Sequence, residues 1–233
     1  MIPLKDENPA RTFPFVVVLL LATNLVVYLY QSLLSDGSEA RFVYTYGAIP
    51  ALLLGKARAH GLAPLHPIWL SIFTSMFLHG SVLHLGANML YLWIFGNNVE
   101  DALGHLRFLS FYFLCGAIAA GAQIAMSLSS PVPMIGASGA IAGVLGAYYV
   151  KFPNARIRTL VFIFFLVTIV SIPASVLLII WFLLQVLQST ATMGTPAAHG
   201  GVAVFAHVGG FIAGWALVRR LEPRRRRPRP MRW

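Results

Sequence analysis

The stretch GASGAIAGVLGAYYV, residues 136–150, decides how the rest of the chain is interpreted. It sets Ser138 between glycines at the start of a small-residue apolar helix that ends before Lys151 and Pro153. Small residues at this spacing commonly let two membrane helices pack closely. Taken alone, Ser138 therefore fits a packing or capping residue better than a nucleophile, and the surrounding sequence has to decide between the two.

The composition indicates a membrane protein rather than a soluble one. Of 233 residues, 58% are hydrophobic and only 10% are charged, which predicts one polytopic membrane domain. The net charge of +10 is concentrated in short segments, a pattern that reflects membrane topology and not nucleic-acid binding. Cys115 is the only cysteine, so an internal disulfide is excluded, and the histidines show no ligand spacing. We expect neither a metal nor a cofactor.

The apolar runs predict an all-α polytopic fold, a bundle of six membrane-spanning helices with a short fourth helix. The expected spans are residues 13–34, 72–95, 108–128, 136–150, 172–188 and 202–218. The apolar piece at 160–170 is expected to be re-entrant or interfacial. In domain terms, residues 1–12 form a cytoplasmic N-terminal segment, 13–218 the membrane domain and 219–233 a basic cytoplasmic tail. Within the membrane domain we expect a partly interfacial first loop (35–71) and a cap loop at about 189–201.

The charge distribution orients these spans. With both termini in the cytoplasm, the inner side holds fourteen of the seventeen lysines and arginines, including the eight arginines from Arg219 onward. The outer side holds only Arg41, Lys56 and Arg58. Cytoplasmic loops are enriched in positive residues, so this orientation is strongly favoured.

Counting from the cytoplasmic boundaries places three polar residues at one depth. His84 lies thirteen residues before Asn97, Ser138 thirteen before Lys151, and His207 twelve before Arg219. At a rise of about 1.5 Å per residue, all three lie roughly 18 to 20 Å above the inner face. That is about 10 Å below the outer edge of a 30 Å hydrocarbon core. Asn88 shares a helical face with His84 because the two are four residues apart.

The short fourth span suits chemistry at Ser138. About thirteen helical residues cannot cross the bilayer, so the non-helical segment before Ser138 must enter it, inside protein or beside a water-filled cavity. A helix that begins there aims free N–H groups at a developing oxyanion. None of the seven acidic residues falls inside a predicted span. A Ser-His-Asp triad is therefore disfavoured, which leaves His207 or His84 as the base.

These residues together resemble the rhomboid intramembrane serine proteases. The resemblance covers about Phe73 to Trp215 and rests on motifs in family order: His79, His84 and Asn88, then Gly136-Ala137-Ser138-Gly139, then Ala206-His207 with Gly210 and Gly214. It implies a catalytic dyad of Ser138 and the base His207. His84, Asn88 and the Ser138 backbone N–H would form the oxyanion hole. Gly136, Ala137, Gly139, Gly210 and Gly214 would support the site, and His79 would anchor the first loop.

Two positions depart from that pattern. Many rhomboids carry a Trp-Arg pair just before the second span, where this chain has Leu70 and Ser71, with Trp69 one place early. Some members also place an aromatic residue one turn after the nucleophile, to stack on the base, and here that residue is Ala142. The imidazole of His207 must then be positioned by another group.

The resemblance implies an endopeptidase that cuts transmembrane protein substrates within or near their spanning helices. The alternatives are a rhomboid-like protein that binds client helices without cutting them, and a small transporter that uses His and Asn as a polar relay. Expected partners are membrane substrates and lipids, with anionic lipids at the arginine tail and no nucleic acid. With no evident transit peptide, the expected location is a prokaryotic plasma membrane. The sequence gives no oligomeric state.

Overall fold

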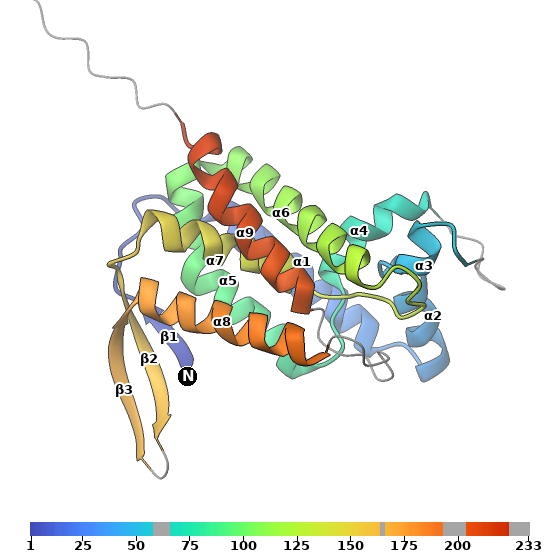
Figure 1. Ribbon diagram of the computed structural model, residues 1–233, viewed down its shortest axis with the longest axis horizontal. Coiled ribbons are helices and arrows are strands. Elements are labelled where there is room, and N and C mark those ends of the chain that lie inside the picture. The colour runs from blue at the N-terminus through green and yellow to red at the C-terminus, as the bar shows by residue number, and fades with distance from the viewer. Residues whose placement is uncertain (58–65, 164–165, 193–203, 224–233) are drawn as a thin grey trace, which may run out of the picture.

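Helices account for most of the protein, and one small antiparallel sheet lies at one end of them (Figure 1). The computed structural model describes residues 1–57, 66–163, 166–192 and 204–223. The longer helices are α1 (Phe15–Ser32), α5 (Val82–Leu103), α6 (His105–Met126), α7 (Ser138–Lys151), α8 (Ala174–Thr192) and α9 (Val204–Leu221). The first loop and the approach to α5 contain α2 (Asp36–Tyr46), α3 (Pro50–Leu53), η1 (Ile68–Leu70), α4 (Ser71–Thr74) and η2 (Ser75–Phe77).

Two of the described helices, α1 and α6, are long and apolar enough to cross a membrane. A third candidate is the pair Ile68–Phe77 and Val82–Leu103, which is bent by 84° at its break. The predicted second span, 72–95, is thus divided, and α5 begins only at Val82. Ser81 caps this helix, because its hydroxyl accepts the backbone N–H of His84 at 3.1 Å. The bend sets His84 and Asn88 in the first two turns of a new helix.

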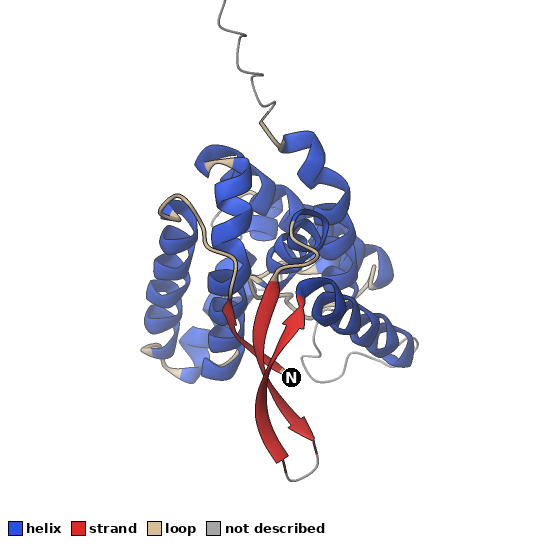
Figure 2. Ribbon diagram, turned by 90° about the vertical axis from the view of Figure 1, so that its left-hand side faces the viewer, coloured by secondary structure: helices blue, strands red, loops and turns tan. Residues whose placement is uncertain are grey.

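The all-α prediction is wrong for the segment between α7 and α8. Strands β2 (Arg156–Ile163) and β3 (Leu166–Pro173) pair antiparallel, and β1 (Ile2–Asp6) adds a third strand beside β2 (Figure 2). The piece at 160–170 is therefore not helical. Its β-branched residues favour extended backbone, and pairing satisfies the backbone groups that a lone re-entrant chain would leave open. Phe162 and Val167, a cross-strand pair, are both more than half exposed.

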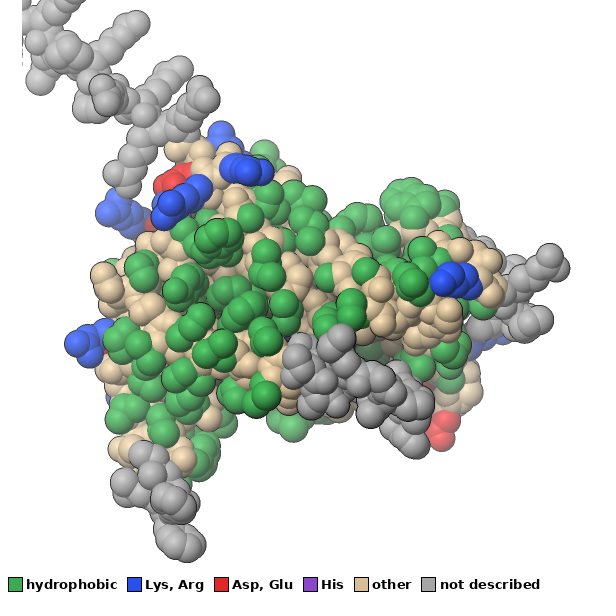
Figure 3. All heavy atoms as spheres, viewed as in Figure 1, with side chains coloured by type: hydrophobic (Ala, Val, Ile, Leu, Met, Phe, Trp, Pro, Cys, Tyr) green, Lys and Arg blue, Asp and Glu red, His purple; other side chains and the backbone are tan. Residues whose placement is uncertain are grey.

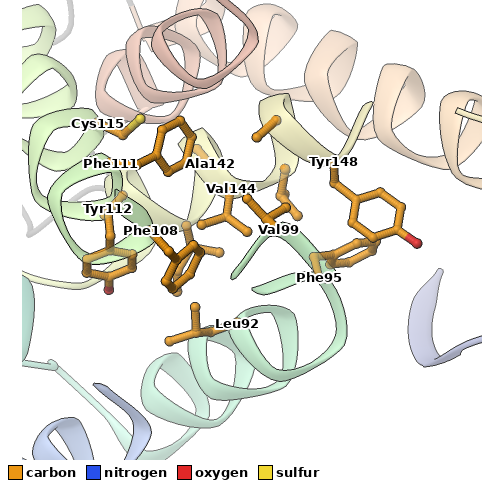
Figure 4. Close-up of a cluster of buried hydrophobic side chains, with 14 of the residues drawn as sticks. Leu92, Phe95, Val99, Phe108, Phe111, Tyr112, Cys115, Ala142, Val144 and Tyr148 are labelled. Carbon is orange, nitrogen blue, oxygen red and sulfur yellow. The ribbon is translucent and has the colours of Figure 1, made fainter. Parts of the chain in front are cut away.

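The helix that carries Ser138 lies at the centre of the bundle. Residues 140–148 of α7 are all buried, between α5, α6 and α9. Figure 4 shows the apolar cluster around them, in which Phe108, Phe111 and Val144 pack from α6 and α7. Hydrocarbon tails are as apolar as these side chains, so close packing and not water exclusion holds such a cluster together in a bilayer.

Helices α7 and α9 meet through their main chains. A Cβ atom added to Gly214 would overlap the carbonyl oxygen of Gly143, and one added to Gly210 would overlap that of Gly139. On the facing side, a Cβ at Gly146 would overlap the carbonyl oxygen of Phe211. No side chain stands between the helices at these points, so their separation is set by backbone atoms.

The residues expected at the cytoplasmic face gather at one end of the molecule. Lys151 at the end of α7 forms an ion pair with Glu222 beyond α9. In the sheet, Lys5 of β1 lies opposite Arg158 of β2. Figure 3 shows Lys and Arg side chains at the end where α9 finishes, and mostly hydrophobic side chains over the neighbouring part of that face.

Helix α5 continues beyond the end of the predicted second span. That span was expected to end at residue 95, whereas the helix ends at Leu103. Glu100 is fully buried, and its carboxylate accepts the backbone N–H groups of Val16 and Val17 at 2.9 and 2.8 Å. It therefore satisfies free N–H groups in the first turn of α1, which has no side-chain cap of its own.

Candidate active site

Ser138 is the first residue of α7 and follows a non-helical approach. Gly136 has a φ of +117°, a conformation that favours glycine, and its N–H donates to the carbonyl oxygen of Ser75 at 2.9 Å. Two residues earlier, Met134 exchanges both backbone hydrogen bonds with Ala48 of the first loop. Protein groups thus satisfy both backbone groups of Met134 and the N–H of Gly136. Helix α7 has no side-chain cap at its N-terminus, so the first N–H groups of the helix, beginning at Ser138, have no capping partner of that kind.

His207 on α9 reaches Ser138 directly. The imidazole Nε2 lies 2.7 Å from the Ser138 Oγ, and the His207 residue is only 8% exposed. The glycine contacts between α7 and α9 hold the two helices at the separation that this contact needs. A serine and an imidazole at hydrogen-bonding distance can pass a proton from the hydroxyl to the ring, which activates the oxygen as a nucleophile.

The structure adds two side chains of α8 that the sequence analysis did not single out. The Gln185 Oε1 lies 2.6 Å from the Nδ1 of His207, and the Trp181 ring packs against the imidazole with centroids 6.0 Å apart. Trp181 and Gln185 are one helical turn apart and share a face. The signal was an amide inside an apolar run, where polar side chains are costly and face the protein interior. Gln185 and Trp181 therefore contact the His207 ring in place of the aromatic residue that position 142 lacks.

His84 and Asn88 lie against the turn before the nucleophile. A Cβ atom at Gly136 would come within 2.8 Å of the His84 Cε1 and 3.8 Å of the Asn88 Nδ2. Asn88 is 6% exposed, and its Nδ2 has no hydrogen-bond partner in the described part of the chain. Two side chains with N–H groups therefore border the loop that leads into Ser138, and one of them holds a free donor.

His79 is fully buried near the same turn, but its ring forms no hydrogen bond to the described part of the first loop. Its ring packs edge-on against His84 with centroids 5.0 Å apart, and neither ring nitrogen has a hydrogen-bond partner among the described residues. Its backbone carbonyl instead accepts the Gln31 side-chain amide at 2.8 Å. His79 is thus tied to α1 through its main chain and supports His84 by packing.

The remaining residues expected to support the site pack closely around it. Ala137 is fully buried, and a Cβ at Gly139 would lie 2.8 Å from the Cβ of Ala119 on α6. A pocket of about 40 Å³ opens beside Ser138 between η2, α6 and the approach loop, lined among others by Ser75, Gly116 and Ile135. This volume holds a water molecule or two. The predicted cap loop lies outside the described residues from 193 onward, and residues 189–192 form the end of α8.

The comparison with known families decides the identity. The Rhomboid domain family matches residues 66–223, which is more than half of the chain and includes every predicted site residue. The chain belongs to the rhomboid family. It is therefore a membrane protein, and this membership indicates an intramembrane protease or a rhomboid-like protein without that activity.

Curated relatives of this rhomboid support the assignment. It is 33% identical to Rhomboid protein 1, mitochondrial, of Saccharomyces cerevisiae, across 68% of this chain and 44% of the relative. It is 30% identical to Rhomboid protease GluP of Bacillus subtilis, across 64% and 27%. It is 31% identical to Presenilin-associated rhomboid-like protein, mitochondrial, of Bos taurus, across 50% and 32%. The match thus spans less than half the length of each of these proteins.

Proposed function

We propose that this rhomboid is an intramembrane serine endopeptidase whose catalytic dyad is Ser138 and His207. The observation that carries the proposal is the 2.7 Å contact between the Ser138 Oγ and the His207 Nε2, at the buried start of α7. Ser138 is the nucleophile and His207 the general base. The similarity to a protein named as a rhomboid protease supports the same function.

The reaction follows from the positions of these groups. His207 takes the hydroxyl proton at Nε2 while the Ser138 oxygen attacks the scissile carbonyl carbon, which forms a tetrahedral intermediate. The imidazolium then returns the proton to the leaving amine, and an acyl-enzyme forms on Ser138. Water, activated by the same imidazole, attacks this ester and releases the second product. The pocket beside Ser138 has room for that water.

The oxyanion of the intermediate needs donors that are in place before the reaction. The N–H of Ser138, at the start of α7, and the side chains of His84 and Asn88 are assigned this role. The Asn88 Nδ2, which has no partner among the described residues, supports the assignment, since a buried donor without a partner costs free energy unless a ligand accepts its hydrogen bond.

The substrates are proposed to be transmembrane proteins that enter beside α8. A membrane helix must unwind to expose its amide, so Gly, Pro or polar residues near the scissile bond would favour cleavage. The approach loop can pair with the unwound strand. Met134 and Gly136 already bond Ala48 and Ser75, so the substrate would use the opposite edge, at Ile135.

We further propose six spans with both termini in the cytoplasm, membrane-domain bounds of 13–218 and a location in a prokaryotic plasma membrane. The gathering of Lys151, Lys5 and Arg158 at one end supports this orientation. Two of the relatives above are named as mitochondrial, so the type of membrane rests on the sequence alone. The basic residues of 219–233 are proposed to be attracted by anionic lipids of the inner leaflet.

A fluorophosphonate probe tests the dyad directly. Labelling of the reconstituted protein should modify Ser138, and both labelling and substrate cleavage should disappear in Ser138→Ala and His207→Ala. Ser110→Ala is the matched serine control, because Ser110 is an exposed residue of α6 bonded only to its own helix. Cleavage by purified Ser138→Ala at the normal rate would overturn the proposal. A client-binding rhomboid-like protein or a transporter would show no labelling at all.

A further inference from the structure

We propose that Gln185 is the positioning residue of the base, so that His207 is competent only while α8 is packed against α9. This inference rests on the proposed dyad. It adds Gln185 as a third residue and the packing of α8 against α9 as a requirement for activity. Its basis is the 2.6 Å contact between the Gln185 Oε1 and the His207 Nδ1, together with the 2.7 Å contact on the opposite side of the ring.

The two contacts select one tautomer of the imidazole. A neutral imidazole has one N–H and one nitrogen that accepts. The Gln185 carbonyl oxygen can only accept, so the proton resides on Nδ1 and the Nε2 lone pair points at the Ser138 hydroxyl. Without Gln185 the proton is free to occupy Nε2, and the ring then cannot take the serine proton. In the soluble Ser-His-Asp enzymes, holding this tautomer is the task of the aspartate.

An amide suits this task inside a membrane. A carboxylate at this depth would carry a large desolvation cost, whereas a neutral amide accepts the same hydrogen bond without a buried charge. All seven carboxylate residues of the chain lie in described parts of the structure. The hydrogen-bond partner of the His207 Nδ1 is nevertheless the amide of Gln185.

Both groups that hold the ring come from a helix at the edge of the bundle. In Figure 1, α8 runs along the outside of the molecule, and Leu183 and Leu184 are 58% and 53% exposed. On its inner side, Phe182 packs on Phe211 of α9 with ring centroids 4.7 Å apart. The buried helix α7 supplies no aromatic ring at Ala142. Movement of α8 away from α9 would therefore remove Gln185 and Trp181 together.

Substitutions at Gln185 test the positioning role in the full-length protein in proteoliposomes. Gln185→Met keeps the size and removes the acceptor, and it should lower kcat by about 10- to 100-fold with little change in KM, part of the roughly 10²–10⁴ that a positioned base supplies. Fluorophosphonate labelling should slow by a similar factor. Gln185→Glu keeps an acceptor at this position, as the carbonyl oxygen of a carboxyl group that burial holds neutral, and it should retain most of the wild-type rate. Leu184→Ala on the exposed face is the matched control and should behave as wild type.

A spectroscopic readout separates positioning from a merely structural effect. In ¹⁵N NMR of protein labelled at histidine, His207 should be the Nδ1–H tautomer in the wild type and a mixture of both tautomers in Gln185→Met. An unchanged kcat together with an unchanged tautomer in Gln185→Met would overturn the inference. If the wild type itself is not labelled by the fluorophosphonate, the proposed dyad is overturned instead, so the two failures are distinguishable.

A double-mutant cycle tests the dependence on α8. Phe182→Ala weakens the packing of α8 on Phe211 without touching the amide, and it should slow labelling about 5- to 20-fold. If packing acts through Gln185, the double variant Phe182→Ala/Gln185→Met should be about as slow as Gln185→Met alone. If the rate losses of the two single variants instead multiply in the double variant, the packing of α8 and the positioning of His207 are independent. That result would contradict the coupling.

Discussion

The Nε2 of His207 lies 2.7 Å from the Oγ of Ser138, although 69 positions of the chain separate the two residues. Their helices touch through the main chains at Gly139 and Gly210, close to this contact. The distance between the proposed nucleophile and base is thus fixed by backbone atoms one helical turn or less from the reacting groups. Substitution of either glycine should therefore change the distance between Ser138 and His207, and with it the rate of cleavage.

Gly214→Ala should force α9 away from α7. The new Cβ would overlap the Gly143 carbonyl oxygen, which is backbone and cannot rotate aside. We expect a loss of about 3 kcal/mol in the free energy of unfolding, typical of strong overpacking, and a large loss of cleavage. Gly121→Ala on α6 is the control, since nothing lies within 4 Å of its Cβ and alanine favours a helix. Thermal unfolding in detergent measures both, and equal melting temperatures for the two variants would contradict the packing argument.

Gly136→Ala should reduce cleavage without a comparable loss of stability. The residue has a φ of +117°, and its Cβ would press within 2.8 Å of the His84 ring, so both the approach loop and His84 must shift. A fall in kcat of at least about 10²-fold is expected, the size of losing one oxyanion donor. In Gly80→Ala the nearest atom is a methyl carbon 3.8 Å away, and that variant should stay close to wild type.

Asn88→Ala should lower kcat by about 10²- to 10³-fold with a small effect on KM, because its amide would donate mainly in the transition state. The free Nδ2 has no structural partner to lose within the described residues, so stability should hardly change. Steady-state cleavage of a membrane substrate, beside thermal unfolding, separates the two effects. A variant that unfolds readily but cuts normally would show that Asn88 is structural.

Glu100→Ala should destabilise the start of α1. Its buried carboxylate accepts from Val16 and Val17 and also contacts His105, and each buried N–H left without a partner costs about 1–3 kcal/mol. We expect a total loss of about 2–5 kcal/mol in the free energy of unfolding. The neighbouring Asp101→Asn keeps an acceptor for the exposed Thr12 and should change stability by less than about 0.5 kcal/mol.

The Asp6 carboxyl should make stability depend on pH in an unusual direction. Burial raises its pKa above the ordinary value of 3.8, and the hydrogen bond from the Tyr148 hydroxyl lowers it only in part. The folded state therefore holds the proton more tightly than the unfolded state. This contribution to stability is complete below about pH 3.8 and is lost as pH rises through the raised pKa.

Asp6→Asn removes that titration, so wild type should lose stability relative to the variant as pH rises from about 4. Thermal unfolding of both proteins in detergent across this range measures the difference. At each pH the Asp6→Asn variant serves as the reference for the wild type, so the titration of all other groups cancels in the difference. A wild type that gains stability relative to Asp6→Asn with rising pH would reverse the assigned sign.

Much of the site could be inferred from polar residues in apolar runs. Counting from polar boundaries put Ser138, His84 and His207 at one depth, and the structure brings Ser138 and His207 into contact. This works because a polar side chain in a membrane span faces the protein, so depth and helical face leave few possible neighbours. Gln185 carried the same signal, but its role depends on how α8 docks, which no local pattern specifies.

The hairpin and Glu100 show where local patterns fail. Residues 160–170 are a short apolar run, and periodicity does not separate a buried helix from paired strands of this length. Its third strand comes from Ile2–Asp6, about 150 positions earlier. Likewise, no local pattern predicts the burial of Glu100, because its partners Val16 and Val17 are more than 80 positions away in the chain.

The backbone contact between Gly143 and Gly214 also bears on how the protein meets bilayers of different thickness. Membrane helices answer a thinner or thicker hydrocarbon core chiefly by changing their tilt. Two helices in contact through their main chains should tilt as one body, so we expect the gap between Ser138 and His207 to be the same in short-chain and long-chain lipids. Helix α8, which is held on one side only, has no such restraint. Lipid chain length should therefore act on the rate through α8 and leave the separation of the dyad unchanged.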